Sequence, residues 1–317
     1  MTPNREFSID IRVPASTANL GAGFDCLGLA LELYLHVRAT AISMPGAHAI
    51  ARSRGVPGTA ELPTSPEENL IFRAMTHTAE HEGFYLPPVR LAVQNDIPVA
   101  AGLGSSAAAN VAGSVLAFAV AGRPLSKEVA LQCAAEMEGH ADNVAAALLG
   151  GLVVTFTRDD GSVDAVQKRW PKMIRIVVVT PKFTLETKKS RAVLPKTIDH
   201  ADAVHNLQRS ALLIAALDER RYDLIWDALQ DRVHQSYRQA LIPGLDKALA
   251  APRMHGLMGV ALSGAGPSVI ALAVDNFDKI GREIARRFES RGLAATFQTL
   301  EAAQEGFTTS DKRLRQR

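Results

Sequence analysis

The sequence predicts a protein of mixed helices and strands that folds as two domains. Its 317 residues are more than one typical hydrophobic core organises. Segments that alternate apolar and polar residues, typical of strands, are interspersed with segments of helical spacing. The polar stretch at residues 159–171 separates two such series. We therefore expect an N-terminal domain at residues 1–165 and a C-terminal domain at residues 166–317.

Composition and charge narrow the class of protein. Hydrophobic residues make up 47% and charged residues 21% of the chain, which is ordinary for a soluble globular protein. The 35 basic and 33 acidic residues give a net charge of +2, which argues against nucleic acid as the main partner. No apolar run is long enough for a signal core or a membrane span, so we expect a cytoplasmic protein without a membrane partner. The cysteines, Cys26 and Cys133, predict neither a disulfide framework nor a Cys-based metal site.

The first half of the chain begins with an alternating strand pattern at residues 7–13. Residues 15–25 are small, polar and rich in glycine, which predicts a loop. Asn19 and Asp25 are its strong hydrogen-bonding side chains. Because the loop follows a strand, these side chains lie where folds of helices and strands commonly hold their sites.

A second glycine-rich stretch, at residues 97–113, lies between a strand pattern at 89–94 and an Ala-rich segment that predicts a buried helix. Gly102 and Gly104 remove side chains where the backbone must turn and approach something closely. Ser105 and Ser106 stand at the expected helix start, where a hydroxyl can accept from an unpaired backbone N–H. Such a turn suits a phosphate, although it lacks the lysine of a Walker loop. A plain capped turn into a core helix is the alternative.

A polar cluster follows the helix that is expected to begin after Ser126. Its spacing does not match a zinc motif such as His-Glu-x-x-His. One carboxylate would suit Mg²⁺, which takes one or two protein oxygens together with phosphates and water. The alternative is a capped junction between helices. The members of the cluster are Glu136, Glu138, His140, Asp142 and Asn143.

The remaining patterns complete the two series. A helix is expected at residues 67–81, with Asn69 in its first turn, where asparagine is commonly a cap or solvated. A buried strand at 174–180 opens the second half, followed by a loop at 183–196 and helices at 203–220 and 222–235. A third glycine-rich stretch, at 259–272, reads as strand, tight turn and strand. A helix at 277–291 and a strand at 294–299 follow, and the basic tail at 308–317 is expected to fray.

Three motifs resemble the signatures of the GHMP small-molecule kinases, in their order and spacing and over nearly the whole chain. They are Pro-Ala-Ser-Thr-Ala-Asn-Leu-Gly-Ala-Gly-Phe-Asp-Cys-Leu-Gly at residues 14–28, Pro-Val-Ala-Ala-Gly-Leu-Gly-Ser-Ser-Ala-Ala at 98–108, and Leu-Ser-Gly-Ala-Gly-Pro-Ser at 262–268. The resemblance implies an α+β fold with an N-terminal ribosomal-protein-S5-like domain and a C-terminal ferredoxin-like domain. It places the active site between these domains, with the third motif closing against the second.

Within that family, the first motif and residues 138–144 resemble the members that phosphorylate L-homoserine, a step of threonine biosynthesis. The resemblance implies ATP and Mg²⁺ as cofactors. It assigns Ser106 and Glu138 to the metal, with Glu136 as the alternative ligand. Asn69 matches a position beside the adenine. The implied phosphate loop comprises Pro98, Val99, Ala100, Ala101, Gly102, Leu103, Gly104, Ser105, Ser106, Ala107 and Ala108.

The resemblance also implies an amino-acid pocket, in which acidic and amide groups accept from the ammonium and arginines pair with the carboxylate. Arg191 and Asn143 are the implied catalytic residues. Because Asn143 stands where mevalonate-type members have a catalytic Asp, the substrate hydroxyl must lose its proton without that base, for example to the γ-phosphate. A role for Asp142 in orienting neighbours or acting through water stays open. The implied pocket residues are Asn19, Asp25, His140, Thr187, Arg191 and Arg238.

Other functions remain as alternatives. A related kinase could act on another small alcohol, such as a mevalonate-pathway metabolite. A non-catalytic binding module of the same fold would be expected to lose the loop glycines or the metal carboxylate, which this chain retains. A dinucleotide-binding oxidoreductase is disfavoured because the loop lacks Gly-x-Gly-x-x-Gly. The sequence leaves a homodimer open.

Overall fold

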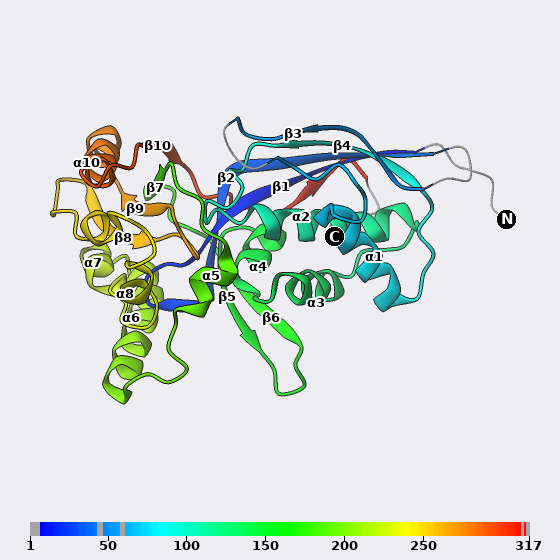
Figure 1. Ribbon diagram of the computed structural model, residues 1–317. Helices are drawn as coiled ribbons and strands as arrows, with labels where there is room; N and C mark the ends of the chain where they lie inside the picture. The colour runs from blue at the N-terminus through cyan, green and yellow to red at the C-terminus, as the bar shows by residue number, and fades with distance from the viewer. Residues whose placement is uncertain (1–6, 43–46, 58–60, 312–313, 315–317) are drawn as a thin grey trace.

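The computed structural model describes residues 7–42, 47–57, 61–311 and 314. Its strands form two sheets, and helices pack against each (Figure 1). We call the larger sheet with its helices the N-terminal part and the smaller sheet with its helices the C-terminal part. No helix in the described ranges combines the length and apolarity that a membrane crossing needs.

The sheet of the N-terminal part has the strand order β11-β1-β2-β4-β3, and β5 pairs with both β2 and β6. Its pairs are antiparallel except β3 with β4, which is parallel. Its strands are β1 (Ser8–Asn19), β2 (Gly23–Ala41), β3 (Ala49–Arg54), β4 (Val89–Asn95), β5 (Leu152–Thr157), β6 (Val163–Lys168) and β11 (Thr308–Thr309).

The loop predicted at residues 15–25 is largely strand. β1 continues to Asn19 and β2 begins at Gly23, with register shifts on either side of the pairs from Ala15 to Ala18. The small side chains that indicated a loop are needed here because α2 and α4 pack closely over this end of β1. Asn19 and Asp25 both have positive φ, at 72° and 54°, so this segment is a strand pair with an irregular end.

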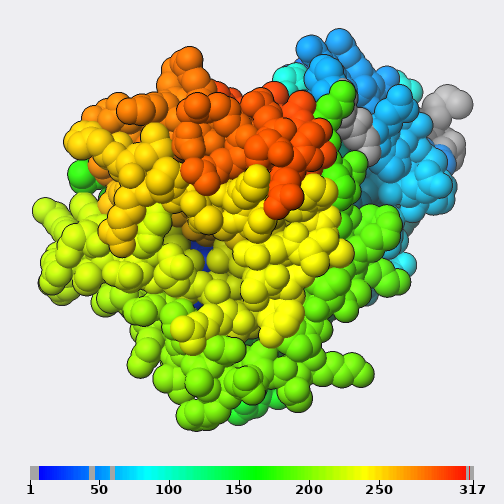
Figure 2. Space-filling model, turned by 60° about the vertical axis from the view of Figure 1, so that its left-hand side comes forward, coloured from blue at the N-terminus to red at the C-terminus, as the bar shows by residue number. Residues whose placement is uncertain are grey.

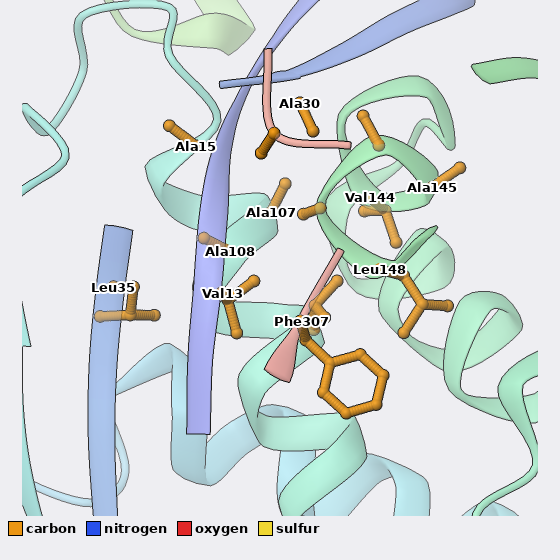
Figure 3. Close-up of a cluster of buried hydrophobic side chains, with 14 of the residues drawn as sticks. Val13, Ala15, Ala30, Leu35, Ala107, Ala108, Val144, Ala145, Leu148 and Phe307 are labelled. Atoms are coloured by element: carbon orange, nitrogen blue, oxygen red, sulfur yellow. The ribbon is translucent and has the colours of Figure 1, made fainter. Parts of the chain in front are cut away.

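Helices cover one face of the N-terminal sheet (Figure 1). The Ala-rich helix is buried on every side from Asn110 to Val120, as its sequence predicted. Figure 3 shows Val13 of β1 beside Ala107 and Ala108 of this helix, in a cluster that also contains Val144. Ser126 caps the next helix by accepting from the N–H of Val129, which confirms the predicted start. The helices are α1 (Leu70–Glu82), α2 (Ser105–Val120), α3 (Lys127–Glu138) and α4 (Asp142–Leu149).

The sheet of the C-terminal part has the order β10-β7-β9-β8 and is antiparallel. The strand–turn–strand pattern predicted at 259–272 is confirmed as β8 and β9. The strands are β7 (Arg175–Pro181), β8 (Leu257–Leu262), β9 (Val269–Ala273) and β10 (Ala295–Leu300). The helices are α5 (Thr187–Ala192), α6 (His200–Asp218), η1 (Tyr222–Leu224), α7 (Ile225–Ala228), α8 (Gln235–Arg238), α9 (Leu245–Leu249) and α10 (Phe277–Glu289).

Three local predictions in this half were wrong. The loop predicted at 183–196 contains α5. The helix predicted at 222–235 is broken, because the carboxylate of Asp231 accepts from the backbone N–H groups of Val233, His234 and Gln235 and starts α8 there. The tail does not fray where it is described: β11 pairs with β1, and Leu314 is buried.

The chain changes sheet between Lys168, the end of β6, and Arg175, the start of β7. The boundary predicted between residues 165 and 166 falls within β6, whose pairing with β5 runs to Lys168. The last residues return to the N-terminal sheet through β11. A division into independently folding domains at that boundary stays a prediction.

The turn between β1 and β2 reaches into the C-terminal part. The backbone oxygen of Ala22 accepts from Asn206 and Ser210 on α6, and that of Gly21 lies 2.8 Å from Nε2 of His234. In Figure 2, dark blue atoms of the N-terminal strands lie at the bottom of a hollow surrounded by yellow residues. The junction between the parts therefore lies beside Asn19 and Asp25.

Candidate active site

A cavity of about 330 Å³ lies at the junction between the two parts. It is lined by the end of β1, the loop before α2, the polar cluster after α3, and α5, α8 and the turn between β8 and β9. Most predicted site residues line it. Ala107 and Ala108 do not, because both are fully buried inside α2. Those on its wall are Asn19, Asp25, Asn69, Pro98, Val99, Ala100, Ala101, Gly102, Leu103, Gly104, Ser105, Ser106, Glu138, His140, Asn143, Thr187, Arg191 and Arg238.

The N-terminus of α2 opens toward this cavity. Its N-cap is Gly104, at φ 69°, and no side chain caps this helix. The expectation that Ser105 and Ser106 cap it was wrong: Ser105 accepts from Asn95, and Ser106 donates to Glu138. The N–H groups of the first turn are therefore available to an anion, and the helix dipole favours one there.

The loop before α2 is tied to the turn between β8 and β9. Ser263 Oγ donates to the backbone oxygen of Gly102 at 2.6 Å, and the N–H of Ser268 donates to that of Ala101 at 3.2 Å. Gly102 has φ 79°, and a Cβ there would collide with the Ser263 carbonyl. Glycine is therefore required at 102 by close contact between the two parts as well as by backbone conformation.

A pair of oxygen-bearing side chains lies beside the α2 N-terminus. Ser106 Oγ is 2.6 Å from one carboxylate oxygen of Glu138, and Asn110 Nδ2 donates to the other at 2.8 Å. Glu136 instead faces outward and contacts Gln132 and His77. Among the described residues, no three or more His, Cys, Asp or Glu side chains are grouped so that they could hold a metal ion by themselves. One carboxylate and one hydroxyl suit Mg²⁺, whose remaining ligands are commonly water and phosphate.

The polar cluster forms a connected network deeper in the cavity wall. Asp142 is 1% exposed and accepts from the N–H of Asn143 at 2.7 Å. Its carboxylate lies 2.8 Å from Nδ1 of His140. Burial by itself lowers the pKa of His140, but hydrogen bonding to Asp142 and the nearby charges of Asp142 and Glu138 raise that pKa overall. Asn143 Oδ1 accepts from Ser16 Oγ at 2.9 Å.

The C-terminal part contributes two arginines to the cavity wall. Arg191 donates to both carboxylate oxygens of Asp25, at 2.9 and 2.6 Å. Arg238 is 1% exposed, and it donates to the backbone oxygens of Gly264 at 2.9 Å and Ser190 at 3.3 Å. Burial, followed by the like charge of Arg191, lowers the pKa of Arg238 to about 10. This part of the wall can therefore bind a ligand that carries both a positive and a negative group.

Asn19 and Asn69 are held by the backbone around them. Asn19 donates to the Gly264 oxygen at 3.0 Å and accepts from the N–H of Asp25 at 3.1 Å. Asn69 is the N-cap of α1: it accepts from the N–H of Ile71 and donates to the oxygen of Pro63. The expectation that Asn69 is a helix cap is thus confirmed. Asn69 also lines the cavity.

The residue pattern alone did not identify Ser16, Asn110 and His234. Asn110 could have been found from its spacing, since it follows Ser106 by one helical turn on α2. Ser16 lay within the predicted loop, where a serine is unremarkable. His234 carried no local signal, because its contacts come from residues distant in sequence.

Comparisons with known proteins agree with this geometry. The models of the GHMP kinases N terminal domain and the GHMP kinases C terminal domain match residues 69–151 and 213–290. The homoserine kinase of Desulfitobacterium hafniense is 40% identical over 304 residues, covering 94% of this chain and 98% of the relative. That of Deinococcus radiodurans is 45% identical over 271 residues, 85% of each chain.

Solved structures show the same fold. The homoserine kinase from Cytophaga hutchinsonii superposes with a TM-score of 0.84 at 29% identity, over 98% of both chains. A Lactococcus lactis galactokinase complexed with galactose shares the fold, with a TM-score of 0.68 at 14% identity over 95% of both chains. The α+β fold expected from the sequence is therefore correct. The chain belongs to the homoserine kinase family of the GHMP kinases.

Proposed function

We propose that this protein transfers the γ-phosphoryl group of ATP to the hydroxyl of L-homoserine, giving O-phospho-L-homoserine and ADP in threonine biosynthesis. The observation that carries the proposal is a single cavity with different chemistry on two parts of its wall. One part has the open N-terminus of α2 beside Ser106 and Glu138. The other has Arg191 and Arg238 beside Asp25. The first suits a nucleotide phosphate and the second suits an amino acid.

We assign the nucleotide to the loop at residues 98–104 and the α2 N-terminus at Ser105 and Ser106. The amide nitrogen and oxygen of Asn69 are already bonded to the backbone. Asn69 therefore shapes the adenine site through the backbone that it holds and not by a direct hydrogen bond. Ser106 and Glu138 would hold Mg²⁺. When bound, the ion supplies positive charge to the phosphates. Asn110 keeps the carboxylate of Glu138 in place by donating to one of its oxygens.

We assign the amino acid to the part of the wall that Arg191, Arg238 and Asp25 form, which we call the amino-acid wall. The Arg191–Asp25 pair joins two charges that a zwitterion can replace with its own: the substrate ammonium pairs with Asp25 and its carboxylate with Arg191. Arg238 adds a second guanidinium, and Asn19, His140 and Thr187 complete the wall. Asn143 also lines the cavity.

No base is required in this arrangement. Asn143 cannot take a proton, and its Oδ1 already accepts from Ser16. Asp142 is already bonded to His140 and Asn143. The hydroxyl proton passes to an oxygen of the transferred phosphoryl group. Positioning and charge stabilisation then account for the rate, as phosphoryl transfer commonly allows.

A coupled assay of ADP release with L-homoserine, serine, threonine and mevalonate tests the reaction. We expect L-homoserine to have the highest kcat/KM. A preference for mevalonate would contradict the proposal and favour the related-kinase alternative. Absence of both ATP binding by calorimetry and turnover of any alcohol would favour a binding module.

We also propose a cytoplasmic location, because a biosynthetic kinase needs the ATP supply of that compartment. Light scattering of the purified protein measures whether it forms the homodimer that the sequence left open.

Substitution of Gly104 by alanine should weaken ATP binding and destabilise the fold. The first atom that a Cβ would meet is Ser16 Oγ, with Asn143 Oδ1 3.2 Å away. Alanine at positive φ costs about 1 kcal/mol on its own. Thermal unfolding and the KM for ATP measure both effects.

The double variant Gly104→Ala with Ser16→Gly separates the causes. Removing the hydroxyl relieves the collision, so the double variant should unfold at a higher temperature than Gly104→Ala alone. An equal KM for ATP in wild type and both variants would place the phosphates elsewhere.

A further inference from the structure

Arg238 is held in a polar network that the proposed reaction does not itself explain. Besides the Gly264 and Ser190 oxygens, its guanidinium contacts Nδ1 of His234, with Nη1 at 3.0 Å. His234 lies one helical turn before Arg238 and has no exposed surface. Histidine is seldom fully buried, so its place beside an arginine assigned to substrate binding needs an explanation.

The contacts of His234 define its protonation state. Nε2 lies 2.8 Å from the backbone oxygen of Gly21, which can only accept, so Nε2 carries the proton. Nδ1 faces an arginine that can only donate, so Nδ1 is the acceptor. The ring is therefore neutral, and each nitrogen has a partner from a different segment.

Both parts of the protein hold the ring in place. The carboxylate of Asp231 accepts from the N–H of His234 at 3.0 Å and fixes its backbone. The ring of Phe24, on β2, stacks on the imidazole with centroids 5.3 Å apart. The same Phe24 ring lies 5.5 Å from the guanidinium carbon of Arg238 and 5.6 Å from that of Arg191. The imidazole thus connects the β1–β2 turn to Arg238.

We propose that His234 is a positioning residue for the substrate carboxylate. Its neutral ring accepts from Arg238 and donates to Gly21, and so holds the guanidinium in place to bind that carboxylate. The inference rests on the proposed function, since it takes Arg238 to bind homoserine. In this role His234 does not contact the nucleotide. Changes at His234 should therefore affect the binding of homoserine and not that of ATP.

Protonation gives this role a pH signature. A second proton on Nδ1 would oppose the arginine donor and break the contact. The charged groups that act on the ring are Asp231, Arg238 and Asp25. Burial lowers the pKa of His234 and, together with the charge of Arg238, outweighs the charges of Asp231 and Asp25, which raise it. The neutral ring therefore persists at neutral pH and is lost only on acidification, when the KM for homoserine should rise.

A matched pair of substitutions separates the two nitrogens. The amide oxygen of His234→Asn can take the place of Nδ1 and keep the contact with Arg238. The longer side chain of His234→Gln reaches the place of Nε2 and keeps the contact with Gly21 but not the one with Arg238. We expect His234→Gln to raise the KM for homoserine about tenfold, as for a lost hydrogen bond to a charged group. His234→Asn should change it less, and the KM for ATP should stay within about twofold of wild type in both.

Two further measurements complete the test. The acid-side rise in the homoserine KM should be smaller in His234→Asn than in wild type. Ring ¹⁵N NMR of the wild-type protein should show the Nε2–H tautomer of His234 at neutral pH. This measurement does not depend on the folding of any variant. An Nδ1–H or charged ring would overturn the inference, as would equal effects of Asn and Gln on homoserine, or equal effects on both substrates. A wild-type enzyme that does not turn over homoserine contradicts the proposed function instead.

Discussion

Arg238→Leu is expected to lower kcat/KM for L-homoserine by about 10²- to 10³-fold, equivalent to about 3 to 4 kcal/mol. The guanidinium is buried in the cavity wall, so a carboxylate paired with it is shielded from water. Removing it leaves the substrate charge buried without its partner. The dissociation constant for ATP, measured by calorimetry, should change little, because Arg238 lies on the amino-acid wall.

The substrate supplies the control for this variant. An amino alcohol without a carboxylate should be a poor substrate of the wild type and should lose little more in Arg238→Leu. Equal losses for both substrates would mean that the arginine only supports the structure. Some loss of stability is expected, because the oxygen of Ser190 and Nδ1 of His234 lose a donor, at about 1 to 3 kcal/mol each. The oxygen of Gly264 still accepts from Asn19. Thermal unfolding measures that part separately.

The structural role of Arg238 could not be predicted from the sequence. No motif in the sequence around it indicates a packing role for the arginine. Two of its acceptors are backbone oxygens 48 and 26 positions away in the chain. Backbone acceptors have no residue type, so no sequence motif marks them. Only the fold brings them to one guanidinium.

Local patterns predicted most of the fold where local physics decides it. The cap at Ser126 and the strand pair around the third glycine-rich stretch formed as expected. The segment at 15–25 was mispredicted because small residues favour loops and also allow a strand to lie under closely packed helices. The break before α8 depends on one carboxylate, Asp231, whose three backbone bonds outweigh an otherwise helical pattern.

The resemblance, and not residue spacing, brought the candidate site together. Asn19, Glu138 and Arg238 are far apart in the chain, and no periodicity relates them. The structure lines one cavity with all three. The two candidates for the metal, Glu136 and Glu138, were not distinguished by sequence. They are two positions apart on α3, which points them in different directions.

Glu138→Gln is expected to lower kcat by about 10²-fold or more and to raise the Mg²⁺ concentration needed for half-maximal rate, as for loss of a group that stabilises transferred phosphoryl charge. The amide keeps the shape of the side chain and its place beside Ser106 and Asn110, but it removes the negative charge. Calorimetry should show weaker binding of ATP in the presence of Mg²⁺. Binding of ATP without the metal should be unchanged or tighter, since a repelling carboxylate is gone.

Glu136→Gln is the matched control, because it makes the same chemical change on the same helix. The side chain of Glu136 is 41% exposed and pairs with His77, whereas that of Glu138 is 11% exposed and faces the cavity. An exposed pair of this kind contributes about 0 to 1 kcal/mol, so the control should keep wild-type kcat and Mg²⁺ dependence. A metal requirement that shifts in Glu136→Gln and not in Glu138→Gln would reverse the assignment. Because both variants differ from wild type by one amide, a difference between them follows from position on α3 and not from net charge.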